Sequence, residues 1–231
     1  MISKFMNIAI IPCRIGSKRI KKKNIKEFYG KPIIIHTINN IIQSKIFGKI
    51  IVSSDSLMVR NILIKHKQIL FHKRPKKYSE DNSSTVDAIK SCILDMKIFK
   101  NLNICCIYPC APMINFEDLK KTKKILDINS DFFVTPVKKY SHPIQRSFRL
   151  SKNNRIIEIN KKFNNTQTQK INQSYHDVGQ FYWGRASSWI KYKSVLINSI
   201  AYPTNRVEYI DIDDYDDWIL SKRIFKLFKN I

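Results

Sequence analysis

Near the start of the chain stands Asn7-Ile-Ala-Ile-Ile11, and directly after it the loop Pro12-Cys-Arg-Ile-Gly-Ser-Lys-Arg-Ile-Lys-Lys-Lys-Asn24. A short apolar run that ends at a proline is typical of a buried strand. In open α/β sheets, ligands bind beyond the carboxyl ends of the strands. We therefore expect a buried first strand over 7–11, followed by a ligand-binding loop.

The rest of the first half alternates short apolar runs with longer amphipathic ones. Strands are expected at 49–53, 103–108 and 131–137, and helices at 32–44, 57–66, 83–96 and 116–126. Asn115 is a suitable cap for the last of these helices. Strands that alternate with helices indicate a three-layer α/β/α fold with a mainly parallel, Rossmann-like sheet.

The second half of the chain is less regular. Residues 138–175 are largely polar, with strand-like pieces at 145–150 and 155–159, and are expected to form an inserted lid or dimerisation segment. Further strands are expected at 180–183 and 206–210, then a helix from about Asp214. Four residues of that helix fall on one predicted apolar face: Leu220, Ile224, Leu227 and Phe228. We expect a single domain over 1–231.

Composition limits the class of protein. The chain has 231 residues, of which 43% are hydrophobic, enough for one substantial core. A net charge of +24 suits a nucleic-acid-binding protein, but the lysines are scattered from Lys4 to Lys229 instead of forming one patch. Nucleic-acid binding is thus the less favoured alternative, and the positive field suits capture of small anions.

The chain has no apolar stretch of about 18 residues, so we expect no membrane partner. The apolar run at 8–12 is too short for a signal peptide, which predicts a cytoplasmic protein. The five cysteines do not indicate a disulfide framework. Cys105, Cys106 and Cys110 match no common zinc spacing, and the first two lie in an apolar run, so buried thiols are expected.

Three stretches have residue types that suit chemistry. The loop at 12–24 joins a Gly16–Ser17 turn to six cationic side chains, which can bind a polyphosphate. It matches neither a Walker A loop nor a GxGxxG fingerprint. The alternative is a solvated surface loop, and charge alone does not decide between the two.

The second stretch is the acidic run Asp211-Ile-Asp-Asp-Tyr-Asp-Asp217. Alternate side chains of a strand point the same way, so Asp211 and Asp213 are expected to converge at the end of the 206–210 strand. Two convergent carboxylates suit Mg²⁺. Asp214, Asp216 and Asp217 suit the cap and first turn of the next helix, and a capping role for all five is the alternative.

The third stretch is Tyr175-His-Asp-Val-Gly-Gln-Phe-Tyr-Trp-Gly184, a polar and aromatic run that suits a sugar pocket. Strand alternation predicts Asp177 and Gly179 on one face and His176 and Gln180 on the other. The alternative is that this run only packs the core.

These stretches resemble the CMP-sialic acid synthetase family. The basic loop is similar to its signature R-x-G-S-K-R-I-P-x-K-N, with Ile15 where Gly is common and Lys21 where Pro is usual. The resemblance implies that Arg14, Lys18 and Lys23 hold the triphosphate and act in catalysis. It also assigns residues to nucleotide binding: Arg14, Gly16, Ser17, Lys18, Asn24, Arg74 and Ser83.

Two further features extend this resemblance. Arg74-Pro75 with Ser79 and Asp81 resembles the family segment R-P-x-x-L-S-x-D, which implies that Arg74 positions the cytosine nucleotide. Ser83 is expected either to lie at a helix N-terminus facing the nucleotide or simply to cap that helix. Asp211 and Asp213 correspond to the acidic pair that holds Mg²⁺ in the family.

Residues 176–184 resemble the H-D-A-G-Q-F-Y-W-G run of the pseudaminic acid branch of this family, with Val178 in place of Ala. The resemblance implies these sugar-binding residues: Tyr108, Gln145, Arg146, Asp177, Gly179 and Gln180. Gln167 stands where Arg is usual. The implied reaction transfers CMP from CTP to the anomeric hydroxyl of a nonulosonic acid, pseudaminic acid before sialic or legionaminic acid. A homodimer is also implied, and no residue stands out as general base.

Overall fold

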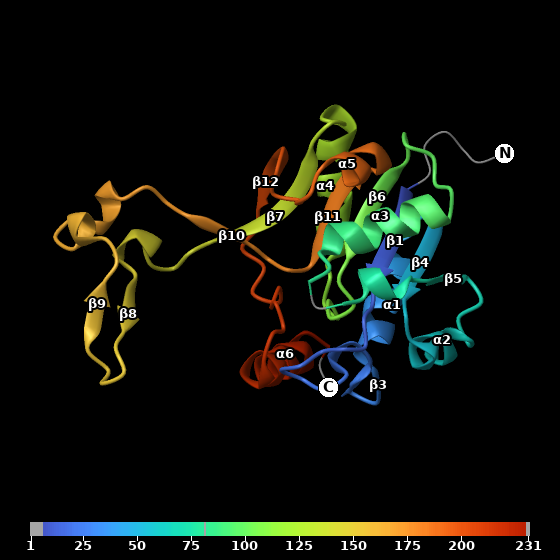
Figure 1. Cartoon of the computed structure of the whole chain (residues 1–231), viewed down its shortest axis with the longest axis horizontal. Coiled ribbons are helices and arrows are strands. Elements are labelled where there is room, and N and C mark those ends of the chain that lie inside the picture. Colours follow the sequence, from blue (N-terminus) through green and yellow to red (C-terminus); the bar gives the residue numbers. More distant parts are fainter. Residues whose placement is uncertain (1–6, 81, 230–231) are drawn as a thin grey trace.

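A computed structural model describes residues 7–80 and 82–229 (Figure 1). Within these residues the main sheet has eight strands, of which four pair in parallel in the order β6-β1-β4-β5. These strands are β1 (Asn7–Pro12), β4 (Lys49–Ser54), β5 (Ile69–Lys73) and β6 (Asn103–Ile107). The expected strand over 7–11 is therefore central to the sheet.

The other half of the sheet is mixed. Its strands are β7 (Phe133–Lys139), β10 (Tyr175–Asp177), β11 (Phe181–Arg185) and β12 (Ser199–Pro203). Strand β11 runs antiparallel between β6 and β7, β10 is antiparallel to β7, and β12 lies parallel beside β7. The sheet thus has a mainly parallel core, and the predicted Rossmann-like α/β fold is confirmed.

Helices cover both faces of the sheet. One face carries α1 (Ile33–Ser44), α2 (Leu57–Leu63) and α4 (Phe116–Ile128), and the other carries α3 (Thr85–Asp95) and α5 (Ala186–Lys191). Strand β1 serves both layers, because Ala9 and Ile11 pack with the first set while Ile8 and Ile10 pack with the second. All four are at most 2% exposed.

The last helix, α6 (Tyr215–Lys229), packs apart from these layers against the small hairpin of β2 (Glu27–Phe28) and β3 (Lys31–Pro32) (Figure 1). Trp218 and Phe225 are buried against the Phe28 ring, with centroids 5.4 and 5.1 Å away. The predicted apolar face is wrong at Leu220, Leu227 and Phe228, which stay exposed, and holds only at Ile224, which packs against this cluster. The large aromatic rings turn the helix so that they fill the cluster instead.

Between β7 and β10 the chain leaves the sheet as a projecting segment, residues 140–174, which we call the arm (Figure 1). It contains the antiparallel hairpin of β8 (Phe148–Leu150) and β9 (Ile156–Glu158), together with three short 3₁₀ turns. Those turns are η3 (Ile144–Arg146), η4 (Lys161–Phe163) and η5 (Thr168–Lys170). That a single domain spans the whole chain remains a prediction.

Several expected elements differ from the structure. The strand predicted over 206–210 is wrong: the strand in this region is β12, which ends at Pro203, and side chains rather than a ladder hold the segment after it. Helix α2 ends at Leu63 instead of residue 66, and β5 was not predicted. Cys105 and Cys106 are buried in β6, as expected. Among the described helices none is long and apolar enough to cross a bilayer.

Candidate active site

A cavity of ≈ 380 Å³ lies where β1, β5 and β6 end, lined there by Pro12, Arg74 and Tyr108. It brings together most of the predicted site residues, from segments far apart in the sequence. These are Arg14, Ser17, Lys18, Lys23, Asn24, Arg74, Ser83, Tyr108, Gly179, Asp211 and Asp213. Cations from the N-terminal loop therefore share one cavity with carboxylates from the C-terminal end.

The basic loop is held in shape by its own polar contacts. After β1 the chain turns at Ser17, whose N–H donates to the Ile15 carbonyl at 2.9 Å, and then enters η1 (Lys23–Ile25). Asn24 is buried, and its Nδ2 donates to the Arg14 carbonyl at 2.7 Å. Asn24 thus fixes the loop at the residue that carries its first guanidinium.

Arg74 lies directly after β5 and is only 4% exposed. Its Nε donates to Ser79 Oγ at 3.1 Å, while its buried Nη2 has no hydrogen-bond partner within the described residues. Burial lowers the pKa of Arg74 below its ordinary value, although a guanidinium stays charged. An unpaired buried donor in a cavity wall fits an acceptor on a bound ligand. Asp81, of the same motif, lies outside the described residues.

Helix α3 begins at the cavity wall. Ser84 is its N-cap, since Ser84 Oγ accepts from the Asp87 N–H at 3.1 Å and Asp87 Oδ2 accepts from the Ser84 N–H at 3.2 Å. Ser83 instead donates to the Lys77 carbonyl at 2.8 Å, so the alternative in which it caps the helix is wrong by one position. Thr85 was not predicted as a site residue, yet it lines the cavity and its Oγ1 lies 3.0 Å from Tyr108 Oη.

The acidic run divides into two parts with different contacts. Asp214 Oδ1 accepts from the Asp216 and Asp217 N–H groups, and Asp217 Oδ2 accepts from the Asp213 and Asp214 N–H groups. The predicted cap of α6 is therefore confirmed for Asp214 and Asp217. Asp211 and Asp213 line the cavity, although the segment that carries them is not a strand.

Asp211 and Asp213 have different electrostatic surroundings. Asp213 Oδ1 lies 2.9 Å from Arg19 Nη2 and 3.7 Å from Lys23 Nζ. Asp211 reaches solvent, but the cavity wall removes part of its hydration. This loss, together with the charge of Asp213, raises the pKa of Asp211 to about 6. A bound cation would reverse that effect, because a positive charge stabilises the ionised carboxylate.

The residues present fit Mg²⁺. The described part of the chain has no group of three or more His, Cys, Asp or Glu that could hold a metal. Two carboxylates leave most of an octahedral shell for water and substrate phosphate oxygens, which is the coordination Mg²⁺ commonly takes. Asp211 and Asp213 line the cavity together with a third carboxylate, Glu80, and their role as metal ligands stays a prediction.

The run 175–184 is not one strand but two, because the chain turns between β10 and β11. At the turn, Gly179 has φ +58° and its N–H donates to Asp177 Oδ1 at 3.0 Å. Gln180 is buried and its Nε2 donates to the Ile210 carbonyl at 2.9 Å. The expected alternation of faces is therefore wrong. Gly179 lies against the side chain of Asp211, and Gln180 contacts the backbone of Ile210.

Gln145 and Arg146 lie in the arm. Arg146 Nε donates to the Phe163 carbonyl at 3.2 Å and Nη1 to Thr168 Oγ1 at 3.1 Å, while Nη2 donates to the Thr166 carbonyl. Five predicted residues do not line the cavity of their own chain: Gly16, Gln145, Arg146, Asp177 and Gln180. Their roles stay predictions.

Comparison with known proteins supplies the class. A family model described as "Cytidylyltransferase" matches residues 8–221, and the chain belongs to that family. More particularly, the chain is 32% identical over 224 residues to the pseudaminic acid cytidylyltransferase of Campylobacter jejuni subsp. jejuni serotype O:23/36, covering 96% of this chain and 97% of that protein. The family resemblance seen in the sequence is thereby confirmed.

Two other matches place the chain more widely. It is 26% identical over 236 residues to the CMP-N,N'-diacetyllegionaminic acid synthase of Legionella pneumophila, covering 95% of this chain and 96% of that protein. The solved structure of CMP:2-keto-3-deoxy-manno-octonic acid synthetase complexed with CTP superposes with a TM-score of 0.71 over 96% of this chain and 99% of that one, at 14% identity. The latter match shows a shared fold alone.

Proposed function

We propose that the protein transfers CMP from CTP to the anomeric hydroxyl of a nonulosonic acid, with pseudaminic acid preferred. The observation that carries this proposal is the single cavity that joins the cationic loop to Asp211 and Asp213. Preference for pseudaminic acid is supported by 32% identity to the C. jejuni relative, against 26% to the legionaminic acid synthase. The comparisons give no support to the nucleic-acid alternative.

In the proposed reaction the anomeric oxygen attacks the α-phosphorus of CTP and forms a new P–O bond. The bond to the β-phosphate oxygen breaks, pyrophosphate leaves, and the hydroxyl proton passes to solvent. Arg14, Lys18 and Lys23 bind the triphosphate and stabilise the charge on the leaving group. The Gly16–Ser17 turn offers backbone N–H groups, while Asn24 keeps the loop in its binding shape.

Mg²⁺ is the proposed cofactor, with Asp211 and Asp213 as its protein ligands. When bound, it supplies a Lewis acid that offsets negative charge on the phosphates. Ion pairs with Arg19 and Lys23 hold the Asp213 carboxylate in place. The unpaired Nη2 of Arg74 suits an acceptor on the nucleotide, and Ser83, which also lines the cavity, is retained as a nucleotide contact.

The sugar side of the site is proposed from the resemblance. Tyr108 and Gly179 line the cavity. Asp177 and Gln180 lie close to Gly179 in the turn between β10 and β11. Gln145 and Arg146 are proposed to act from the arm, in a homodimer where the arm meets a second copy. We place the reaction in the cytoplasm, where CTP is available, and the five free cysteines are consistent with a reducing compartment.

The test is a turnover assay of purified protein with CTP, Mg²⁺ and a panel of sugar acids, measuring pyrophosphate. We expect kcat/KM for pseudaminic acid to exceed that for N-acetylneuraminic acid, and EDTA to stop turnover. Equal use of ATP or GTP would disprove the cytidylyl assignment. Equal use of both sugars would disprove the pseudaminic acid assignment alone.

A further inference from the structure

Both proposed metal ligands stand on an irregular segment, residues 204–214, that is joined to no sheet ladder in the described structure. Side chains from elsewhere bind its carbonyl groups instead. Gln180 Nε2 donates to the Ile210 carbonyl at 2.9 Å, and Lys138 Nζ donates to the Tyr209 carbonyl at 2.7 Å. A segment without a ladder needs such contacts if two carboxylates are to keep a fixed separation.

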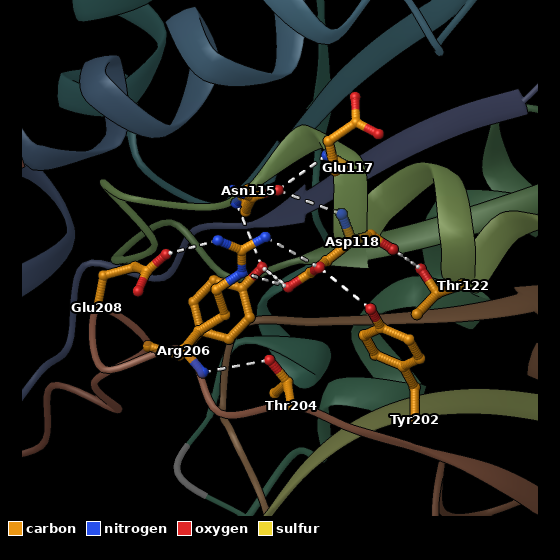
Figure 2. Close-up of polar contacts among 9 residues, drawn as sticks. Asn115, Glu117, Asp118, Thr122, Tyr202, Thr204, Arg206 and Glu208 are labelled. Atoms are coloured by element: carbon orange, nitrogen blue, oxygen red, sulfur yellow. Dashed lines mark hydrogen bonds and ion pairs between the residues drawn. The ribbon is translucent and has the colours of Figure 1, made fainter.

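One buried carboxylate, Asp118, binds side chains of this segment (Figure 2). Asp118, on α4, is 2% exposed, and its Oδ2 accepts from Tyr209 Oη at 2.9 Å and from Arg206 Nε at 3.1 Å. Its Oδ1 accepts from Tyr202 Oη, on β12, at 3.1 Å. A buried charge is stable only when it is paired and hydrogen-bonded, so these contacts are mutually dependent.

We propose that Asp118 is a positioning residue for Asp211 and Asp213, acting through the Tyr209 hydroxyl. Tyr209 lies two residues before Asp211, so fixing its ring restrains the backbone position from which Asp211 and Asp213 extend. This inference rests on the proposed function, because it assumes that the pair binds the metal. Asp118 is not among the residues that line the cavity, so it would act through other residues.

The network offers a matched pair of variants. Tyr209→Phe and Tyr202→Phe each remove one hydroxyl that donates to Asp118, but only Tyr209 belongs to the irregular segment 204–214. Tyr209 Oη also accepts from the Asn115 N–H at 3.3 Å, so its loss is expected to lower stability more. A purely stabilising network would nevertheless leave metal binding unchanged in both variants. A positioning network would change metal binding only in Tyr209→Phe.

The experiment measures the Mn²⁺ dissociation constant by EPR titration in the presence of CTP, the Mg²⁺ concentration for half-maximal turnover, and the unfolding temperature. We expect Tyr209→Phe to raise both metal constants by roughly 10-fold, the scale of losing one hydrogen bond to a charged group. Tyr202→Phe should change either constant by less than about twofold, although both variants unfold at lower temperature.

Equal metal constants in the two variants would overturn the inference. If the wild type neither turns over CTP nor binds Mn²⁺, it is the proposed function that fails. Should Tyr209→Phe not fold, Asp118→Asn takes its place, because it keeps the size of the side chain but removes the charge that binds Tyr209 Oη and Arg206 Nε, and it is expected to give the same rise. No such rise in Asp118→Asn would likewise overturn the inference.

Discussion

Gly179 packs closely against a proposed metal ligand, Asp211. Its φ is +58°, and a Cβ built on it would overlap the carboxylate of Asp211. We predict that Gly179→Ala moves Asp211 and lowers turnover by about 10² or more, the scale of losing one electrostatic contact to the transition state. The assay is kcat against Mg²⁺ concentration. Gly30→Ala is the matched control, since Gly30 also has positive φ but nothing within 4 Å of its Cβ.

The two carboxylates themselves can be tested without altering their size. Asp211→Asn and Asp213→Asn each remove a charged ligand, and we expect turnover to fall by about 10² or more while the fold persists. Circular dichroism and the unfolding temperature check the fold. Asp216→Asn is the control, because its carboxylate lies outside the cavity in the first turn of α6. Near wild-type turnover in both test variants would return the pair to a capping role.

The cysteines should be chemically silent in the folded protein. All five are buried, and loss of hydration raises the pKa of Cys92 and of Cys110 to about 12. Only the thiolate reacts, and a raised pKa leaves almost none of it at pH 8. We predict slow reaction with Ellman's reagent in buffer and five thiols titrated in guanidinium chloride. A fast-reacting thiol in the native protein would contradict the burial of these side chains.

At the scale of one element, α3 separates two neighbouring serines. Ser84 Oγ caps the helix, whereas Ser83 Oγ binds a loop carbonyl. Removing an N-cap hydroxyl destabilises a protein by about 1 kcal/mol. We predict that Ser84→Ala lowers the free energy of unfolding by about that amount in a urea titration and that Ser83→Ala lowers it by less. The reverse order would place the cap at Ser83.

The elements show which sequence signals were sufficient. Strands β1, β4 and β6 were predicted because they are continuous apolar runs, and Asn115 marked the start of α4. Local patterns failed where tertiary contacts decide. The apolar stripe of α6 gave the wrong face, since a cluster around Phe28 selects Trp218 and Phe225.

The candidate site was predicted mainly through motifs. The cationic loop and the acidic pair meet in one cavity, as their sequence types indicated. Thr85 was missed because its site role depends on where the end of β6 places Tyr108, which no spacing reveals. The contact between Gly179 and Asp211 was missed for the same reason: the two residues are 32 positions apart and meet only in the folded chain.

At the scale of the whole molecule, the arm projects away from the rest of the chain (Figure 1). Its hairpin exposes Phe148, Leu150, Ile156 and Ile157 at 49–63%. Several large apolar side chains gathered on one hairpin are typical of an interface with another chain. We predict a homodimer by light scattering, and a monomer for the double variant Phe148→Asp, Ile157→Asp, which places charges on that hairpin.

If a dimer forms, a mixing experiment decides which subunit's arm serves which cavity. Arg146 does not line the cavity of its own chain, so we expect it to act on the second copy. Asp211→Asn and Arg146→Ala should each be inactive alone. Mixed after unfolding and refolding in equal amounts, they should regain about a quarter of wild-type activity, because half of the dimers are mixed and each has one intact cavity. Absence of recovery, with mixed dimers present by mass spectrometry, would mean that Arg146 acts within its own chain or only holds the arm together.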